Sequence, residues 1–83
     1  MTIISFELPD DAVLSMHVPT AEVPRELRMA AAVKLYELGR LSSAAAARLA
    51  GIPRVAFLAK LADYGVEAFR MIEEELLADL RNA

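Results

Sequence analysis

The sequence predicts a mainly α-helical protein with one short strand at its N-terminus, and three observations point to that class. The chain has 83 residues, which is enough for one small domain. Apolar residues recur at helical spacing over 24–38 and again from residue 69 onward. Proline and glycine stand where helices begin and end, as Pro24 and Gly39 do. We expect a single domain over 1–83, with a strand at 1–9, a central helix at 24–38, a helix-turn-helix at 42–62 and an acidic tail at 66–83.

The N-terminal segment has the composition of a strand that ends at Pro9. Its β-branched and aromatic residues alternate imperfectly, with Ile3, Ser5 and Glu7 on one side and Ile4, Phe6 and Leu8 on the other. A lone strand needs a partner. The candidates are a short second strand near 66–69, the same strand of a second copy, or a sheet edge of another protein. Residues 10–16 predict one or two helical turns, and a connector with a surface residue, His17, follows at 17–20.

The central helix supplies the expected core. Pro24 suits its first turn and Gly39 its end. Two apolar stripes lie side by side along it, Leu27, Ala31, Leu35 and Leu38 in one and Met29, Val33 and Tyr36 in the other. Apolar residues therefore cover most of its circumference, which predicts neighbours on several sides.

Two short helices joined by a glycine turn follow, which is the pattern of a helix-turn-helix. Ser42 is a good N-cap for a helix over 43–50, and Gly51 stands where a left-handed residue would end it. Ile52 and Pro53 open the second helix, which we expect to end near Tyr64 and Gly65 and to carry Phe57, Leu58 and Leu61 inward. The small side chain of Ala47 lets the two helices cross closely, and Phe57 fills the angle between them.

The run AVKLYELGRLSSAAAARLAGIPRVAF, from Ala32 to Phe57, resembles the signature of uncharacterised protein family 0175 (UPF0175). The flanks are similar too: Phe6 to Pro9, Arg25 to Arg28, and Leu61 to Val66. The resemblance implies an antitoxin of a type II toxin–antitoxin pair, whose toxin is often a PIN-domain ribonuclease. Together with the helix-turn-helix, this leads us to expect an operator-binding repressor that is dimeric or held in a toxin complex.

Charges are sorted along the chain, with acidic ends and a basic middle. The middle carries Glu26 and Glu37 against Arg25, Arg28, Lys34, Arg40, Arg48, Arg54 and Lys60. Such a block favours a polyanion such as DNA, although scatter over a solvated surface explains it equally well.

In a DNA-bound helix-turn-helix the N-terminal residues of the second helix meet base edges. The outward positions are Arg54, Val55, Ala59 and Lys60. Arg54 suits guanine and Val55 a thymine methyl. The side chains that we expect to contact phosphates are those of Arg40, Arg48, Lys60, Ser42 and Ser43. Pro53 stands where many such helices carry a serine or threonine. The hydroxyl that would cap the second helix and reach a phosphate is therefore absent. So few contacts call for a dimer that reads two half-sites about one helical turn apart.

The tail has an amphipathic pattern, with acidic Glu73, Glu74, Glu75 and Asp79 on its outer side. Its apolar residues are Phe69, Ile72, Leu76 and Leu80, flanked by Met71 and Leu77. Such a helix fits the hydrophobic groove of a basic partner, for which we take these six apolar residues as the binding surface. Folding back on its own domain is the alternative.

The residue types argue against catalysis. The sequence has no cysteine and one histidine, and it has no phosphate-binding glycine loop or nucleophile motif. We therefore expect no enzyme, cofactor or metal site. Without a basic leader or a membrane-length apolar run, we expect a cytoplasmic protein that does not enter membranes.

Two other functions fit parts of the pattern. One is a protein-interaction module whose helix-turn-helix is only core and binds no DNA. The other is a ribbon-helix-helix repressor, which would read bases with Thr2, Ser5 and Glu7, but this strand carries no Arg, Lys, Asn or Gln.

Overall fold

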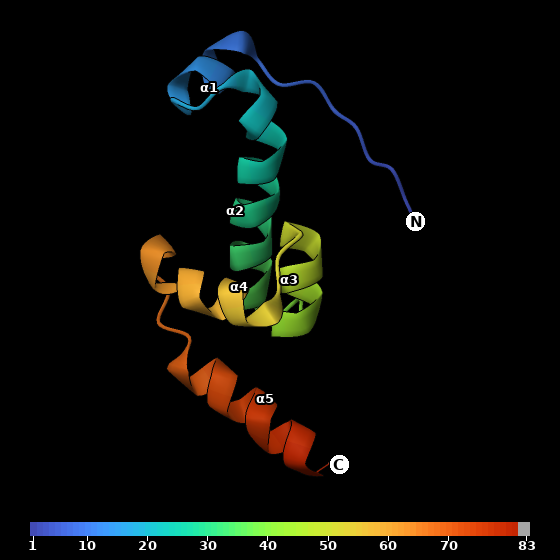
Figure 1. The fold of residues 1–83 in the computed structure, drawn as a ribbon, viewed down its shortest axis with the longest axis vertical. Coiled ribbons are helices and arrows are strands. Elements are labelled where there is room, and N and C mark those ends of the chain that lie inside the picture. Colours follow the sequence, from blue (N-terminus) through green and yellow to red (C-terminus); the bar gives the residue numbers. More distant parts are fainter. Residues whose placement is uncertain (82–83) are drawn as a thin grey trace.

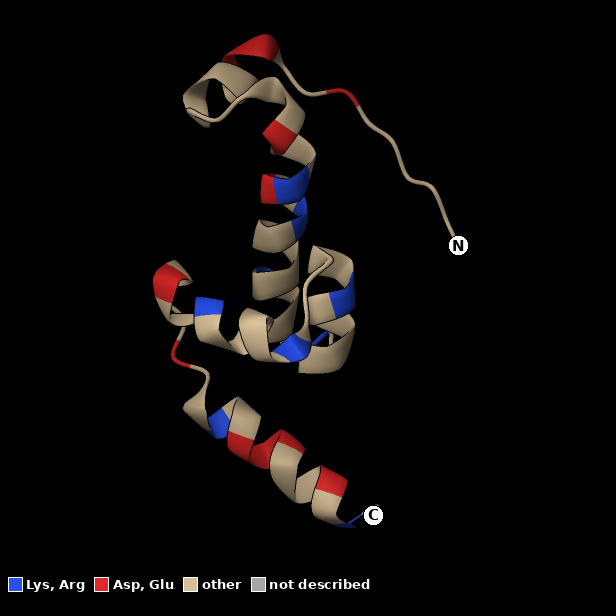
Figure 2. Ribbon diagram, in the orientation of Figure 1, with Lys and Arg blue, Asp and Glu red and all other residues tan. Residues whose placement is uncertain are grey.

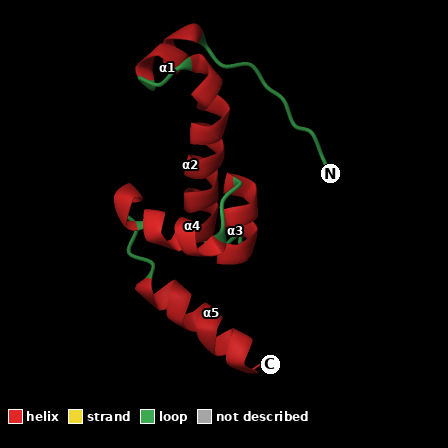
Figure 3. Ribbon diagram, in the orientation of Figure 1, coloured by secondary structure: helices red, strands yellow, loops and turns green. Residues whose placement is uncertain are grey.

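The computed structural model describes residues 1–81, and every regular element in that range is helical (Figures 1 and 3). The mainly α class is confirmed. In chain order the elements are α1 (Asp10–Ser15), the 3-10 turn η1 (Thr20–Glu22), α2 (Val23–Glu37), α3 (Ser43–Ala50), α4 (Arg54–Lys60), the 3-10 turn η2 (Ala62–Tyr64) and α5 (Phe69–Arg81).

The core forms where α3 and α4 pack beside the C-terminal half of α2 (Figure 1). Met29, Val33 and Tyr36 of α2 are buried there, as the second predicted stripe requires. The first stripe is not a core stripe, because Leu27 is half-buried and Leu38 is exposed. The expectation of neighbours on several sides of α2 was therefore too broad. The short α3 and α4 cover one side of a longer helix.

The two short helices and the glycine turn expected after residue 42 are present as α3 and α4, but α4 ends at Lys60 and the 3-10 turn η2, not a continuous helix, reaches Tyr64. The Ser42 hydroxyl accepts a hydrogen bond from the Ala45 N–H at 3.1 Å and so caps α3. Gly51 has φ +76° and ends α3, and the Ile52 N–H then donates to the Ala47 carbonyl at 3.1 Å. Pro53 precedes α4 and provides no side-chain cap.

Small side chains let the two helices of this motif approach each other and α2. Ala46 and Ala47 are buried between them. Phe57, which is 0% exposed, fills the angle and meets the Tyr36 ring edge-on, with ring centroids 5.7 Å apart. The predicted inward positions of Phe57 and Leu61 are thus correct, and Leu58 is half-buried.

The predicted N-terminal strand is wrong for this structure. Residues 1–9 form an extended, mostly exposed arm that leaves the body of the protein (Figure 3), and residues 1–81 contain no strand. Residues 66–68 are not a strand either, and Phe69 already belongs to α5. A strand needs a neighbour to hydrogen-bond with, and the fold brings no extended segment beside the arm. The helical turn predicted after Pro9 is confirmed as α1, and His17, with φ +56°, follows it on the surface.

The fold is elongated, with principal extents of 47 × 30 × 20 Å. Its radius of gyration is 14.6 Å, whereas a compact domain of this length has about 12 Å. The N-terminal arm and α5 project from opposite ends of the body (Figure 1). These two segments therefore carry much of the surface that is open to partners.

Candidate nucleic-acid and partner interface

Three of the basic residues in the middle of the chain are held by neighbours on the protein itself. Two form ion pairs within a helical turn, and the third hydrogen-bonds to the end of α3. These contacts are Arg25 Nη1 to Glu22 Oε2 at 3.2 Å, Lys34 Nζ to Glu37 Oε1 at 2.7 Å and Arg28 Nε to the Leu49 carbonyl at 2.8 Å. Arg28 thereby stabilises the negative end of the α3 dipole.

Arg40, Arg48 and Lys60 remain exposed, and within residues 1–81 they form no ion pair. Arg40 follows α2, Arg48 lies on α3 and Lys60 ends α4, so the three cations come from separate places on and beside the helix-turn-helix. Figure 2 shows the basic positions of α3 and α4 along these two helices. Val55 is 80% exposed at the start of α4. Ser42 is also exposed, although its hydroxyl oxygen already caps α3. These five predicted DNA contacts are accessible to a ligand.

Ser43 does not belong to that set, because its hydroxyl is not accessible in this structure. It is 1% exposed, and its hydroxyl accepts a 2.7 Å hydrogen bond from Arg54 Nε. Arg54 is only partly exposed, because its guanidinium turns back onto the first turn of α3. In this structure Arg54 therefore does not project outward as a base-reading residue.

Glu75 of α5 is the residue that the sequence reasoning misplaced. Its Oε1 accepts the Ser43 backbone N–H at 2.7 Å, and its Oε2 lies 3.6 Å from Arg54 Nη2. The Tyr36 hydroxyl donates to the same Oε2 at 3.3 Å. Helical spacing held the missing signal, since Glu75 follows Ile72 by three residues and Met71 by four, and both of those pack on the core.

Burial raises the pKa of Tyr36 from its ordinary 10.0 to about 12, and the neighbouring Glu75 carboxylate adds to the rise. The folded chain therefore holds this proton more tightly than the unfolded chain. The contribution of the protonated Tyr36 to the free energy of unfolding is fully present below pH 10. It is lost as pH rises from about 10 to about 12.

We expect the wild type to lose roughly 1 kcal/mol more unfolding free energy between pH 9 and pH 11 than Tyr36→Phe does. Urea unfolding at the two pH values measures the difference, and the other titrating groups are common to both chains. Equal losses in the two chains would show that Tyr36 does not titrate above its ordinary range.

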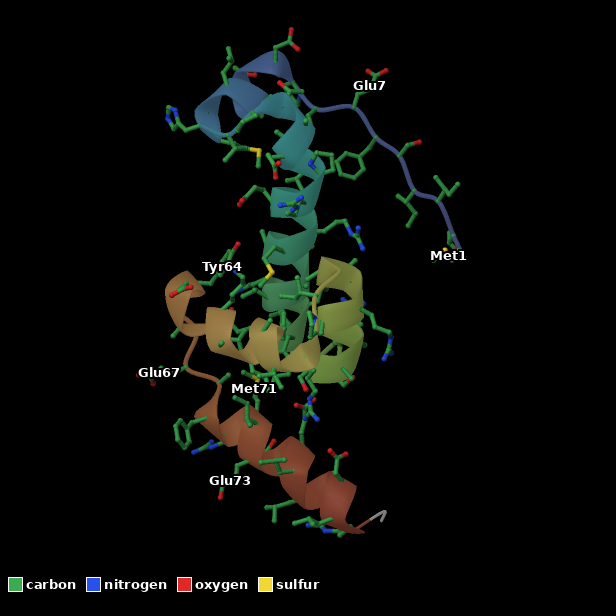
Figure 4. The ribbon with its side chains drawn as sticks, viewed as in Figure 1. Met1, Glu7, Tyr64, Glu67, Met71 and Glu73 are labelled. Atoms are coloured by element: carbon green, nitrogen blue, oxygen red, sulfur yellow. The ribbon has the colours of Figure 1, made fainter. Side chains whose placement is uncertain are left out.

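The apolar residues of α5 divide between two sides. Phe69 is 88% and Leu80 74% exposed, and Leu76 and Leu77 are exposed as well. Ile72 packs against the core but also lines an apolar hollow with Phe69, Glu73 and Leu76. Met71 packs on the core between α4 and the axis of α5 (Figure 4), so it lies apart from the exposed residues of the predicted partner surface. Residues 82–83 of the predicted tail lie outside the described residues.

Two other properties of residues 1–81 concern function. None of the helices there has both the length and the apolar character to cross a membrane. In the same range no three acidic or histidine side chains gather closely enough to hold a metal ion.

The fold and these two surfaces define a small helix-turn-helix protein with an amphipathic C-terminal helix. Residues 1–83 match the family described as "Uncharacterised protein family (UPF0175)". A "UPF0175 protein" of Aeropyrum pernix is 36% identical over 80 residues, which cover 96% of this chain and 84% of the relative. No solved structure matches the chain. The chain belongs to UPF0175, as the run from Ala32 to Phe57 indicated.

Proposed function

We propose that this protein is an antitoxin that binds operator DNA through its helix-turn-helix and a ribonuclease toxin through α5. The observation that carries the proposal is the pairing of two unlike open surfaces on one small chain. Exposed cations lie on or beside α3 and α4, whereas large apolar side chains are exposed along α5. A monomer that worked alone would gain nothing from exposing such a face.

The DNA half of the proposal rests on the accessible cations. Arg40, Arg48 and Lys60 have the chemistry of phosphate contacts, and Val55 is open to a thymine methyl at the start of α4. A single copy offers few such contacts, so the repressor acts as a dimer on two half-sites. The exposed N-terminal arm, whose strand-like residues lack a partner in residues 1–81, is available to pair two copies.

The toxin half rests on the exposed side of α5. Leu76, Leu77 and Leu80 follow Phe69 along about three turns, which is the spacing of a helix that binds in a groove. Acidic side chains beside them, such as Glu73 and Asp79, suit a basic partner. The family resemblance points to a PIN-domain ribonuclease as that partner.

One observation favours a second candidate, a protein-interaction module that binds no DNA. Arg54, the best base-reading side chain, is held by Ser43 and Glu75 in this structure. Salt-dependent DNA binding by the isolated chain separates the two functions, because the interaction module has none.

Arg48→Ala/Lys60→Ala should weaken binding to a duplex that spans the promoter upstream of its own gene. The slope of log K against log salt is negative, and each lost phosphate contact reduces its magnitude by about 0.9, so the magnitude should fall by about 2 per chain. Fluorescence anisotropy between 50 and 200 mM salt measures it.

The matched control is Arg25→Ala/Lys34→Ala, which removes the same two charges at positions already paired with Glu22 and Glu37. This control should bind nearly as the wild type does. If the two double variants lose the same affinity and slope, net charge alone explains binding, and the helix-turn-helix assignment fails.

A further inference from the structure

The carboxylate of Glu75 joins α5 to the first turns of both helices of the helix-turn-helix. Ser43 is the first residue of α3 and Arg54 the first of α4, and both face this one side chain. The contact is partly buried rather than lying on an open surface. α5 thus lies across the ends at which α3 and α4 begin (Figures 1 and 2).

Those same ends are the ones that meet DNA in a helix-turn-helix. The N-terminal residues of the second helix enter the major groove, while the first helix crosses the backbone. Backbone N–H groups at a helix start and arginine side chains are the usual donors to a phosphate oxygen. Glu75 offers an anionic oxygen to both kinds of donor, through Ser43 N–H and the Arg54 guanidinium. Its carboxylate therefore has the chemistry of the phosphate that these donors would bind.

We propose that α5 is an autoinhibitory element, in which Glu75 occupies the phosphate-binding groups of the helix-turn-helix and must leave before DNA docks. This inference rests on the proposed DNA binding. With α5 in place, Glu75 holds the Arg54 guanidinium and the Ser43 backbone N–H, whereas Val55 beside them stays exposed. With α5 displaced, Arg54 and the Ser43 N–H become available together.

The attachment of α5 is suited to such a displacement. The linker at 66–68 connects it to η2, and its contacts with the body come from Ala68, Met71, Ile72 and Glu75. Beyond Glu75 its apolar residues are exposed. Within residues 1–81, Glu75 is thus the last residue of α5 that forms a hydrogen bond or an ion pair with α3 or α4.

The test compares Glu75→Gln with Glu73→Gln on a promoter duplex and on an unrelated duplex of equal length. Both changes remove one negative charge from α5, but Glu73 points away from α3 and α4 (Figure 4). We expect Glu75→Gln to raise affinity for both duplexes about tenfold over the wild type, and Glu73→Gln to raise it no more than about twofold, as expected for the loss of one exposed charge. Equal gains in the two variants would overturn autoinhibition and leave DNA binding intact.

Hydrogen exchange on the wild type provides a second measurement that needs no variant. Saturating duplex should speed exchange of the amides in the second half of α5, because DNA displaces it. Slower or unchanged exchange there, with DNA bound, would contradict the proposal. Absence of salt-dependent binding in the wild type and both variants would instead remove the proposed DNA function, and autoinhibition with it.

Discussion

Phe57→Ala should lower the free energy of unfolding by about 3–5 kcal/mol, the range typical of removing a fully buried phenylalanine. Phe57 is 0% exposed, and its ring packs edge-on against Tyr36. A domain of 83 residues has little stability in reserve, since folded proteins are stable by only about 5–15 kcal/mol. The variant should therefore be largely unfolded at temperatures just below the melting temperature of the wild type. Circular dichroism in urea and on heating measures both effects.

The matched control is Phe69→Ala, which deletes the same ring from a residue that is 88% exposed. Its unfolding free energy should change by less than about 0.5 kcal/mol, as for ordinary surface substitutions. A large loss in the control, or a small one in Phe57→Ala, would mean that the core is not centred on the junction of α2, α3 and α4.

Much of the helix-turn-helix was predictable because its signals are local. Ser42 caps α3 through an atom three residues away, and Gly51 ends it through its own backbone conformation. Pro24 marks the first turn of α2 in the same way. Each of these residues acts on atoms within about one helical turn, so the amino-acid sequence alone is enough to predict where the helix begins or ends.

The strand and two of the site residues could not be predicted, because they depend on what lies nearby in space. The residues at 1–9 favour a strand, but whether a partner strand exists is decided by the whole fold. Arg54 and Ser43 looked like DNA contacts when their helices were considered alone. Glu75, more than twenty positions further along the chain, holds both of them. The sequence analysis put Glu75 on the outer side of α5. Its spacing from Met71 and Ile72 indicates the inner side instead, but no local rule names the group that it meets there.

The division of α5 into an inner and an outer side also changes what the partner proposal predicts. Met71 and Glu75 hold the helix to its own domain, so substitutions there would disturb the fold and the interface together. Leu76 and Leu80 are exposed and serve no contact with the core. They are therefore the positions at which toxin binding can be tested separately from stability.

Leu76→Asp/Leu80→Asp should weaken binding to the product of a neighbouring ribonuclease gene by more than about a hundredfold. Apolar anchors of a helix in a groove contribute about 2 kcal/mol or more each, and a buried unpaired carboxylate adds a penalty. Isothermal titration calorimetry measures the affinity, and a ribonuclease assay measures whether the toxin is released. Stability should stay near that of the wild type, because neither leucine is in the core.

Leu38→Asp is the control, since Leu38 is an exposed leucine at the C-cap of α2 and does not belong to α5. It introduces one carboxylate, half the charge that the double variant adds, and should leave toxin binding within about threefold of the wild type, as for a change outside the interface. If the α5 double variant still binds and neutralises the ribonuclease as the control does, then the toxin binds elsewhere. The N-terminal arm, with its exposed Ile4 and Phe6, would be the next surface to substitute.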